Sequence, residues 1–240
     1  NGTSGGTGAA ARCTATISRN GDLVHRMYLE ISGTPATAQL NVTAQVITDV
    51  EIEIGGQKID KHTGQWMNVW SHLTEPNPSG HSGDCDQTQN GTAFQNMSGM
   101  GGADTDGTTA TVFYVPLQFW FCRNPGLALP LIALQYHEVK VILNHVFATA
   151  RFGTFVHNKL WADYIYLDTD ERRRFAQVSH EYLIEQVQEQ TVSAAVASDL
   201  NFNHPVKELI WCVDAAMDAT PIGSSTATYQ LKLNGHDRFA

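Results

Sequence analysis

The sequence predicts an all-β protein, and three observations support this fold class. Apolar and polar residues alternate with a period of two in several short segments, as in half-buried strands. Glycine, proline and asparagine separate these segments and favour turns there. Two pairs of segments also resemble each other in order and at similar spacing. With 240 residues, the chain can form one large β domain or two smaller ones.

The paired segments suggest a duplicated domain. Residues 24–31 can be aligned with residues 206–213, and residues 52–59 with residues 231–238, each at a separation of about 180 residues. Either alignment alone is weak, because any two strands share alternation. Two alignments in order favour a duplicated β domain whose second copy is cut short at Ala240, with coincidence between strands as the alternative.

The N-terminal part of the chain contains three predicted strands. A strand around residues 13–18 is followed by Asn20-Gly21, a pair typical of tight turns. Alternation then predicts a strand over residues 23–31, which Gly33-Thr34-Pro35 should end because proline lacks a backbone donor. The third strand spans residues 46–54 and should end at a glycine pair.

Two segments have the period of a helix instead. In residues 61–73, two tryptophans and a leucine recur on one helical face, which predicts a short amphipathic helix. Residues 168–177 predict a helical turn, because Asp168 or Thr169 can cap its start and two acids follow in the first turn.

Residues 74–109 are rich in Gly, Ser, Asn, Asp and Pro and predict a long loop. A loop of this length is usually functional or mobile, and we expect it to project from the β domain. Four N-x-S/T sequons begin at Asn1, Asn41, Asn90 and Asn96. The last two lie in this loop, where a glycan would be sterically allowed, so Asn90 and Asn96 are candidate glycosylation sites.

The four cysteines show neither CxxC pairing nor the spacing of metal ligands. We interpret them as free thiols of a reducing compartment, with one structural disulfide as the alternative. They are Cys13, Cys85, Cys122 and Cys212.

The segment around which the chain is organised comprises residues 115–143. Residues 115–121 are rich in Phe and Trp and predict a buried strand, and Asn124-Pro125-Gly126 predicts a type II turn with positive φ at the glycine. An apolar run over residues 127–134 and a strand over residues 139–143 follow. The segment should lie in the core or in a subunit interface, and its marker residues are Phe119, Trp120, Phe121, Asn124, Pro125, Gly126, Leu131, Leu134 and Tyr136.

The C-terminal part of the chain contains four further segments with strand-like patterns. They are residues 162–167, 182–187, 206–213 and 229–233. Between the second and the third lies a stretch of small, weakly patterned residues, which we interpret as a linker.

Composition and motifs argue against several functions. The formal net charge of -9 disfavours a generic nucleic-acid binder, which needs a basic surface. The chain contains no P-loop, dinucleotide-binding fingerprint or G-x-S-x-G motif, so no enzyme is indicated. Its histidines include no His-x-His, and His137-Glu138 lacks the second histidine of a zinc helix. We therefore expect no metal and no cofactor.

The only dense basic cluster is Arg172-Arg173-Arg174. One interpretation is a phosphate-binding element. We favour a capped helical turn whose arginines pair with nearby acids or contact a neighbouring subunit, because the guanidinium fork binds carboxylates through two hydrogen bonds.

Six motifs occur in order over most of residues 17–239. They are GDLVHRMYL at residues 21–29, IGGQKID at 54–60, VPLQFWFCRNPGLALPLIALQYHEVKVIL at 115–143, DYIYLDTDERRRFAQ at 163–177, HEYLIEQVQ at 180–188 and NFNHPVKELIW at 201–211. Together they resemble the major capsid proteins of nucleocytoplasmic large DNA viruses, the group that includes iridoviruses and chlorella viruses.

This resemblance implies a double jelly roll, which is two eight-stranded β-sandwiches in tandem with short helices in the loops. The implied domains are a flexible segment at residues 1–10, a first jelly roll at 11–187, a linker at 188–200 and the incomplete start of a second jelly roll at 201–240.

The resemblance also implies a structural role. Three chains would form a homotrimeric capsomer of pseudo-hexagonal outline, and capsomers would tile the icosahedral shell of a virion assembled in the host cytoplasm. Implied partners are the chain itself, neighbouring capsomers and minor capsid proteins, with an internal viral membrane nearby and no direct nucleic-acid binding. The alternative is a carbohydrate-binding jelly-roll module that uses Trp66 or Trp70, and a cupin-type enzyme is more distant.

Overall fold

The computed structural model describes residues 11–35, 41–75, 92–101, 112–147, 152–191, 197–211 and 230–239. The predicted flexible segment at residues 1–10 and most of the predicted long loop therefore lie outside the described residues. The chain divides into two compact units, Asn1–Pro205 and Val206–Ala240.

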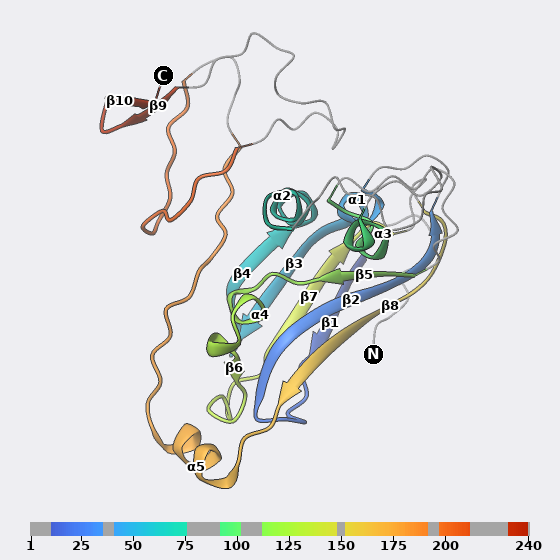
Figure 1. The fold of residues 1–240 in the computed structure, drawn as a ribbon, viewed down its shortest axis with the longest axis vertical. Helices are drawn as coiled ribbons and strands as arrows, with labels where there is room; N and C mark the ends of the chain where they lie inside the picture. Colours follow the sequence, from blue (N-terminus) through green and yellow to red (C-terminus); the bar gives the residue numbers. More distant parts are fainter. Residues whose placement is uncertain are drawn as a thin grey trace. The chain divides into compact units, whose positions relative to one another are not determined.

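The first unit is a β-sandwich, and Figure 1 shows its two sheets. The first sheet has the strand order β1 (Ala11–Thr16), β7 (Val139–His145), β3 (Ile47–Ile54) and β4 (Gln57–Thr63), with antiparallel neighbours throughout. The turn between β3 and β4 is built on Gly55 and Gly56, whose φ values of 59° and 82° favour glycine.

The second sheet is built around β2 (Leu23–Pro35). The strands β5 (Val112–Pro116) and β6 (Leu129–Pro130) pair with one edge of β2, and β8 (Phe152–Ile165) pairs with the other. The two sheets therefore contribute four strands each, as the prediction of an eight-stranded sandwich requires.

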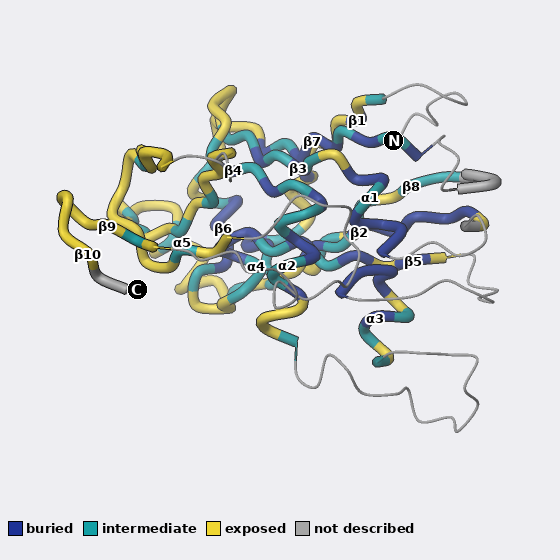
Figure 2. Tube along the Cα trace, turned by 90° about the horizontal axis from the view of Figure 1, so that it is seen from above, coloured by how far each residue is buried: buried dark blue, intermediate teal, exposed yellow. Residues whose placement is uncertain are grey.

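The core lies between the two sheets. Alternate residues of β2 and β3 point into it, and Leu29, Ile31, Val50 and Ile52 are buried. In Figure 2 the buried residues run along the central strands, whereas the chain after β8 is mostly exposed. Burial of each such side chain stabilises the fold by about 1.5–3 kcal/mol, which makes the sandwich the rigid part of the chain.

Three short helices lie near one end of the sandwich (Figure 1). They are α1 (Val42–Val46), α2 (Gly64–Thr74) and α3 (Ala93–Ser98). The amphipathic helix predicted over residues 61–73 corresponds to α2. It begins after Thr63, whose side chain accepts a hydrogen bond from the backbone N–H of Trp66.

Gly64 allows α2 to approach α1 closely. A Cβ atom at this position would lie 2.2 Å from the carbonyl oxygen of Ala44 and 2.4 Å from that of Ile47. Both contacts involve backbone atoms, which cannot move aside as a flexible side chain can. The contact between α1 and α2 therefore requires glycine at this position.

The helix α5 (Thr169–Gln177) follows β8 and agrees with the predicted helical turn. The Asp168 side chain caps it by accepting a hydrogen bond from the N–H of Glu171 at 2.8 Å. The carboxylate of Asp22 accepts hydrogen bonds from Arg172 Nη2 at 3.0 Å and from the N–H of Leu167 at 2.8 Å. The bond from Arg172 is the main reason that the pKa of Asp22 is lowered.

Two predictions for the central segment were wrong. The strand predicted over residues 115–121 ends at Pro116, and the aromatic run begins the short helix α4 (Trp120–Arg123). The type II turn is instead the 3₁₀ turn Pro125–Leu127, in which the side chain of Asn124 accepts a hydrogen bond from the N–H of Gly126. This asparagine-mediated turn needs no positive φ at the glycine.

The ends of the N-terminal strands agree in part with the predictions. Asn20-Gly21 lies in the bend between β1 and β2, which belong to different sheets and do not form a hairpin. The strand β2 continues past its predicted end at residue 31 and ends at Pro35, within the predicted Gly33-Thr34-Pro35 motif, after register shifts opposite β8.

The later strand predictions had mixed outcomes. The strand predicted over residues 162–167 begins much earlier, at the start of β8, and ends at Ile165. Residues 182–187 and the described residues 206–211 do not form regular strands. In the second unit, β9 (Leu231–Leu233) and β10 (His236–Phe239) form a hairpin, which agrees with the last predicted strand. Among the helices that the structure describes, none is long and apolar enough to span a membrane.

Candidate functional site

The central segment contributes a buried aromatic cluster to the first unit. The rings of Phe119 and Phe121 stack with centroids 5.8 Å apart, and Trp120 packs edge-on against Phe121 at 5.1 Å. All three side chains are buried. The cluster continues into His62, whose ring lies 4.7 Å from Phe119. These marker residues therefore belong to the core of one chain.

His62 links this cluster to α2 and to a buried acid. Its ring lies 4.1 Å from the ring of Trp66, and Nε2 lies 2.9 Å from Asp60 Oδ2. That close polar contact is not aligned as a hydrogen bond. The other carboxylate oxygen, Asp60 Oδ1, accepts hydrogen bonds from the N–H groups of Lys61 at 2.9 Å and Val187 at 3.0 Å.

Asp60 thereby fastens residues 178–191, which we call the connecting segment, to the sandwich. Gln186 Nε2 also donates a hydrogen bond to the carbonyl oxygen of Ile59 at 2.5 Å. Arg123 Nη1 lies 3.3 Å from Glu185 Oε2. The connecting segment covers part of the free edge of β4, where unpaired backbone groups would otherwise attract another strand.

The other end of the central segment forms an exposed turn at residues 131–138. Leu131 is 1% exposed, Leu134 is half-buried and Tyr136 is 93% exposed. Two hydrogen bonds hold the turn. Arg19 Nη2 donates to the carbonyl oxygen of Leu134 at 2.7 Å, and the N–H of Gly55 donates to the carbonyl oxygen of Glu138 at 2.9 Å. These bonds fix the backbone that carries the exposed Tyr136 side chain.

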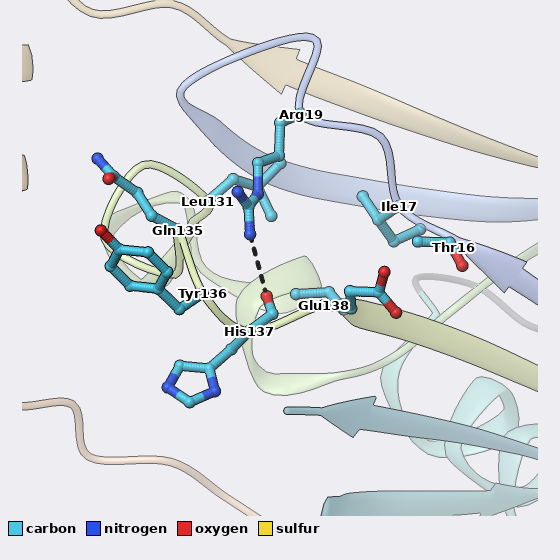
Figure 3. Close-up of a pocket in the computed structure, with 9 residues that line it drawn as sticks. Thr16, Ile17, Arg19, Leu131, Gln135, Tyr136, His137 and Glu138 are labelled. Carbon is cyan, nitrogen blue, oxygen red and sulfur yellow. Dashed lines mark hydrogen bonds between the residues drawn. The ribbon is translucent and has the colours of Figure 1, made fainter. Parts of the chain in front are cut away.

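A shallow pocket of about 320 Å³ lies beside this turn (Figure 3). Arg19 crosses it towards the carbonyl oxygen of His137, at 3.5 Å, and Gln135 and Tyr136 stand on the turn. Asn124, Pro125 and Gly126 are also exposed. These three residues and Tyr136 are therefore not core residues, and their role at an interface stays a prediction.

The outer face of the second sheet carries an aromatic group that the sequence did not predict. The ring of Tyr28 on β2 stacks on Trp161 of β8 with centroids 6.2 Å apart, and it meets Tyr114 of β5 edge-on at 5.9 Å. Trp161 is 46% exposed and Tyr114 is 37% exposed. We call these three residues the aromatic face.

A charged cluster lies next to the aromatic face. The carboxylate of Glu30 accepts hydrogen bonds from His157 Nε2 at 3.0 Å, Lys159 Nζ at 2.9 Å and Trp161 Nε1 at 2.8 Å. These bonds, led by that from His157, lower the pKa of Glu30 to about 2. The Glu30 side chain is only 9% exposed although it points to the outer face.

The outer face of the first sheet has a different character. The acids of β3 point outward there and are paired by neighbouring strands. Glu53 lies 3.8 Å from Lys140 Nζ, and Asp49 accepts a hydrogen bond from Asn144 Nδ2 at 2.6 Å. Glu51 pairs with Lys58. This face is a network of polar pairs, typical of a surface in contact with water.

Cys13 lies beside a histidine and an asparagine, the residue types of a Cys-His-Asn catalytic site. Cys13 Sγ lies 3.4 Å from His145 Nε2 and 3.8 Å from Asn158 Nδ2. The amide contacts the sulfur and not the imidazole, so it does not orient the histidine as a catalytic asparagine does. The thiol and the imidazole are buried, and burial lowers the pKa of His145. The contact between Cys13 and His145 lies within the first sheet, whereas the contact between Cys13 and Asn158 joins that sheet to β8 of the second.

Neither described cysteine is disulfide-bonded, as predicted for Cys13 and Cys122. Burial raises the pKa of the Cys122 thiol to about 12, which makes it a poor nucleophile. Cys85 and Cys212 lie outside the described residues. Within the part of the chain that the structure describes, no three His, Cys, Asp or Glu side chains are grouped to hold a metal ion.

The basic cluster and the sequons have distinct settings. Arg172 pairs with Asp22 of its own chain, whereas Arg173 and Arg174 are exposed on α5. Asn96 lies in α3 and its sequon partner Ser98 is buried. Asn90 lies outside the described residues.

The tryptophans considered for sugar binding are engaged within the chain. Trp66 stacks on Trp70 with centroids 5.5 Å apart, and the guanidinium of Arg123 lies 5.1 Å from the ring centroid of Trp70. Since Trp66 also packs on His62, this stack leaves little ring surface for a sugar.

Comparisons with known proteins agree with the resemblance in the sequence. Residues 2–168 match the family described as major capsid protein N-terminus, and residues 171–232 match the large eukaryotic DNA virus major capsid protein family. The major capsid protein of Pyramimonas orientalis virus is 49% identical over 95% of this chain and 59% of its own length. That of Paramecium bursaria Chlorella virus 1 is 34% identical over 98% of this chain and 64% of its own length.

A solved structure supports the same assignment. The PBCV-1 VP54 crystal structure, fitted into a cryo-EM reconstruction of the virophage Sputnik, has a TM-score of 0.59 and 36% sequence identity. The match covers 77% of this chain and 45% of that one, so this chain spans only part of its relatives. The predicted fold is confirmed, and the chain belongs to the major capsid protein family of large eukaryotic DNA viruses, whose fold is the double jelly roll.

Proposed function

We propose that this chain is a shell-building subunit of a large double-stranded DNA virus. Three copies form a pseudo-hexagonal capsomer, and capsomers tile an icosahedral shell. The observation that carries this proposal is the pair of family matches, which follow each other over residues 2–168 and 171–232. An eight-stranded sandwich with a close-packed interior supplies the stiffness that a shell subunit needs.

The central segment has two roles in this proposal. Its buried part, with Phe119, Phe121 and Leu131, stabilises the sandwich. Its exposed turn presents Tyr136 for contact with another subunit. An anchored aromatic side chain suits such a contact, because little conformational entropy is lost when it is buried.

The remaining contacts of the subunit are also proposals. Arg173 and Arg174, exposed on α5, contact a neighbouring subunit, while Arg172 keeps α5 in place through Asp22. The subunit meets neighbouring capsomers and minor capsid proteins and lies near an internal viral membrane. It has no enzymatic activity, cofactor or direct contact with nucleic acid. The virion is assembled in the host cytoplasm.

Native mass spectrometry of the purified 240-residue chain, combined with electron microscopy, tests this function. Trimers that form hexagonal plates or shells are expected. A monomer that binds glycans in a glycan-array assay would overturn the proposal in favour of the carbohydrate-binding alternative.

A further inference from the structure

We propose that the free edge of β4 is a binding site for an extended segment, and that the connecting segment closes this site in an autoinhibitory contact. An opened site takes the connecting segment of a second copy of this chain. Among the strands that the structure describes, β4 pairs only with β3, so its other edge has no strand beside it. The inference goes beyond the proposed capsid function and does not depend on it.

A bulge in β4 prepares an acceptor on this edge. Lys58 and Asp60 lie opposite adjacent residues of β3, so the register shift leaves Ile59 without a partner residue in the ladder. The side-chain amide of Gln186 donates to the carbonyl oxygen of Ile59 at 2.5 Å. Gln186 thus supplies the donor that an added strand would otherwise supply from its backbone.

The residues on either side of Gln186 are also bound. The N–H of Val187 donates to Asp60 Oδ1 at 3.0 Å, and Glu185 Oε2 lies 3.3 Å from Arg123 Nη1 of α4. Three successive residues of the connecting segment therefore meet a base, a backbone carbonyl and an acid in turn. Such a series of different partners selects one sequence in one register, whereas a bare strand edge accepts many.

The receiving side of the contact is fixed by the core. The side chains of Asp60 and His62 are 0% and 1% exposed, and Asp60 Oδ2 lies 2.9 Å from His62 Nε2. The His62 ring in turn lies between the rings of Trp66 and Phe119, at 4.1 Å and 4.7 Å. These neighbours hold the Asp60 carboxylate in place. The site is therefore preorganised, which reduces the entropy lost when a segment binds.

The connecting segment is held over a short length only. Within the described part of the chain, its hydrogen bonds and ion pairs to the sandwich come from residues 185–187. Gln188 and Gln190 bond instead to residues 199–203, and Leu183 is 88% exposed. A segment with so little buried surface opens at a small cost in free energy while the sandwich stays folded.

The contacts themselves identify the occupant of an opened site. A second copy carries the same Glu-Gln-Val sequence at residues 185–187, so it makes the same bonds in trans. Exchange of an identical element between copies is a low-cost route to association. Repulsion between two copies with a formal net charge of -9 is screened beyond about 8 Å at physiological ionic strength.

The tether explains why the site is closed in a single chain. A segment on a short linker has an effective concentration in the millimolar range, which exceeds the concentration of a second copy in solution. Occupation in trans therefore requires that the contact in cis is first released. This order makes the contact autoinhibitory.

A labelled peptide of residues 180–191 tests the site on the full 240-residue chain. Val187→Pro removes the donor to Asp60 and opens the contact in cis, while the receiving residues are unchanged. Fluorescence anisotropy should show the peptide binding to this variant about tenfold or more tightly than to wild type, in which the tethered segment must first leave. Leu183→Pro is the matched control outside the contact and should remain closed.

Three outcomes of this assay overturn the inference and leave the proposed capsid function standing. Failure of the peptide to bind a folded Val187→Pro variant would refute the site. Equal binding to this variant and to wild type would show that the contact in cis does not close it. A peptide that itself carries Val187→Pro should not bind, and equal binding of both peptides would show that the bond to Asp60 is not recognised.

A mixture of two variants tests the second copy as occupant. The Val187→Pro chain offers an open site, whereas Asp60→Ala keeps the segment and lacks the acceptor for Val187. Hydrogen exchange followed by mass spectrometry reports the Val187 amide, which only the second variant has. Its exchange should slow severalfold when the first variant is added at equal total concentration. Unchanged exchange would overturn the second copy as occupant.

A further variant keeps this experiment decisive. If circular dichroism shows that Asp60→Ala does not fold, Arg123→Ala takes its place, at a side chain that is 21% exposed. Loss of the ion pair with Glu185 likewise releases the segment in cis and leaves its Glu-Gln-Val sequence intact. The same slowing of Val187 exchange is expected in the mixture, and its absence would contradict exchange between copies.

Discussion

The carboxylate of Glu30 accepts a hydrogen bond from the indole nitrogen of Trp161 across 2.8 Å. This contact joins β2 to β8, two strands that are distant in sequence and adjacent in the second sheet. Lys159 and His157, also on β8, donate to the same carboxylate. Glu30 of β2 therefore binds three alternate residues of β8 that all point to the outer face of the sheet.

The first prediction concerns acid. The lowered pKa of Glu30, about 2 against an ordinary value of 4.5, means that the folded chain favours the ionised carboxylate. The stabilisation is fully present above pH 4.5 and is lost as the pH falls towards 2. The midpoint temperature of Glu30→Gln should therefore lie below that of wild type at neutral pH, and the difference should shrink as the pH approaches 2. Thermal unfolding followed by circular dichroism measures it, and a difference independent of pH would contradict the assignment.

The second prediction concerns the contact between α1 and α2. Gly64→Ala should lower the free energy of unfolding by about 1–3 kcal/mol, because the new Cβ atom collides with two backbone carbonyl groups. Gly56→Ala is the control, since its Cβ atom meets open space and only the positive φ opposes alanine, at about 1 kcal/mol. Urea denaturation gives both values. Equal losses in the two variants would show that the collision relaxes.

The third prediction separates the core from the interface within the central segment. Leu131→Asp places a charge at a position that is 1% exposed, and its cost approaches the whole stability of a domain, roughly 5–15 kcal/mol. This variant should not fold. Leu134 is half-buried, so Leu134→Asp should fold and report on assembly. Soluble yield and native mass spectra decide the outcome, and a folded, trimeric Leu131→Asp variant would refute the placement of Leu131.

The fourth prediction concerns the connecting segment. Val187→Pro removes the N–H group that donates to Asp60 Oδ1. A net hydrogen bond to a charged group is lost, so cleavage of residues 178–191 by a glutamate-specific protease should accelerate on the order of tenfold. Leu183→Pro, at a highly exposed position of the same segment, is the matched control. If both variants are cleaved at the same rate, Asp60 does not fasten the segment.

Features determined by neighbouring residues could be predicted from the sequence. The helix α2 was predictable from the helical spacing of its two tryptophans and Leu73, and α5 from its cap Asp168 and the acids of its first turn. The aromatic run at Phe119 was misassigned because Phe119, Trp120 and Phe121 are all buried, and an unbroken apolar run does not distinguish a strand from a helix.

Features determined by distant residues could not be predicted in this way. Nothing near Glu30 in the chain indicates that Lys159 and Trp161 will pair with its carboxylate and cover it. The aromatic face depends on the register between β2 and β8, which only the folded sheet defines. The family resemblance supplied the fold and the function class but did not identify this surface.

The attachment of the connecting segment has a mechanical consequence. A pull on the chain beyond residue 191 would have to break the hydrogen bonds at Asp60 and Ile59 on β4 before it could reach the end of β8. These bonds therefore protect β8, the last strand of the sandwich, from being pulled out of its sheet. Under load, these bonds would break while the sandwich keeps its shape.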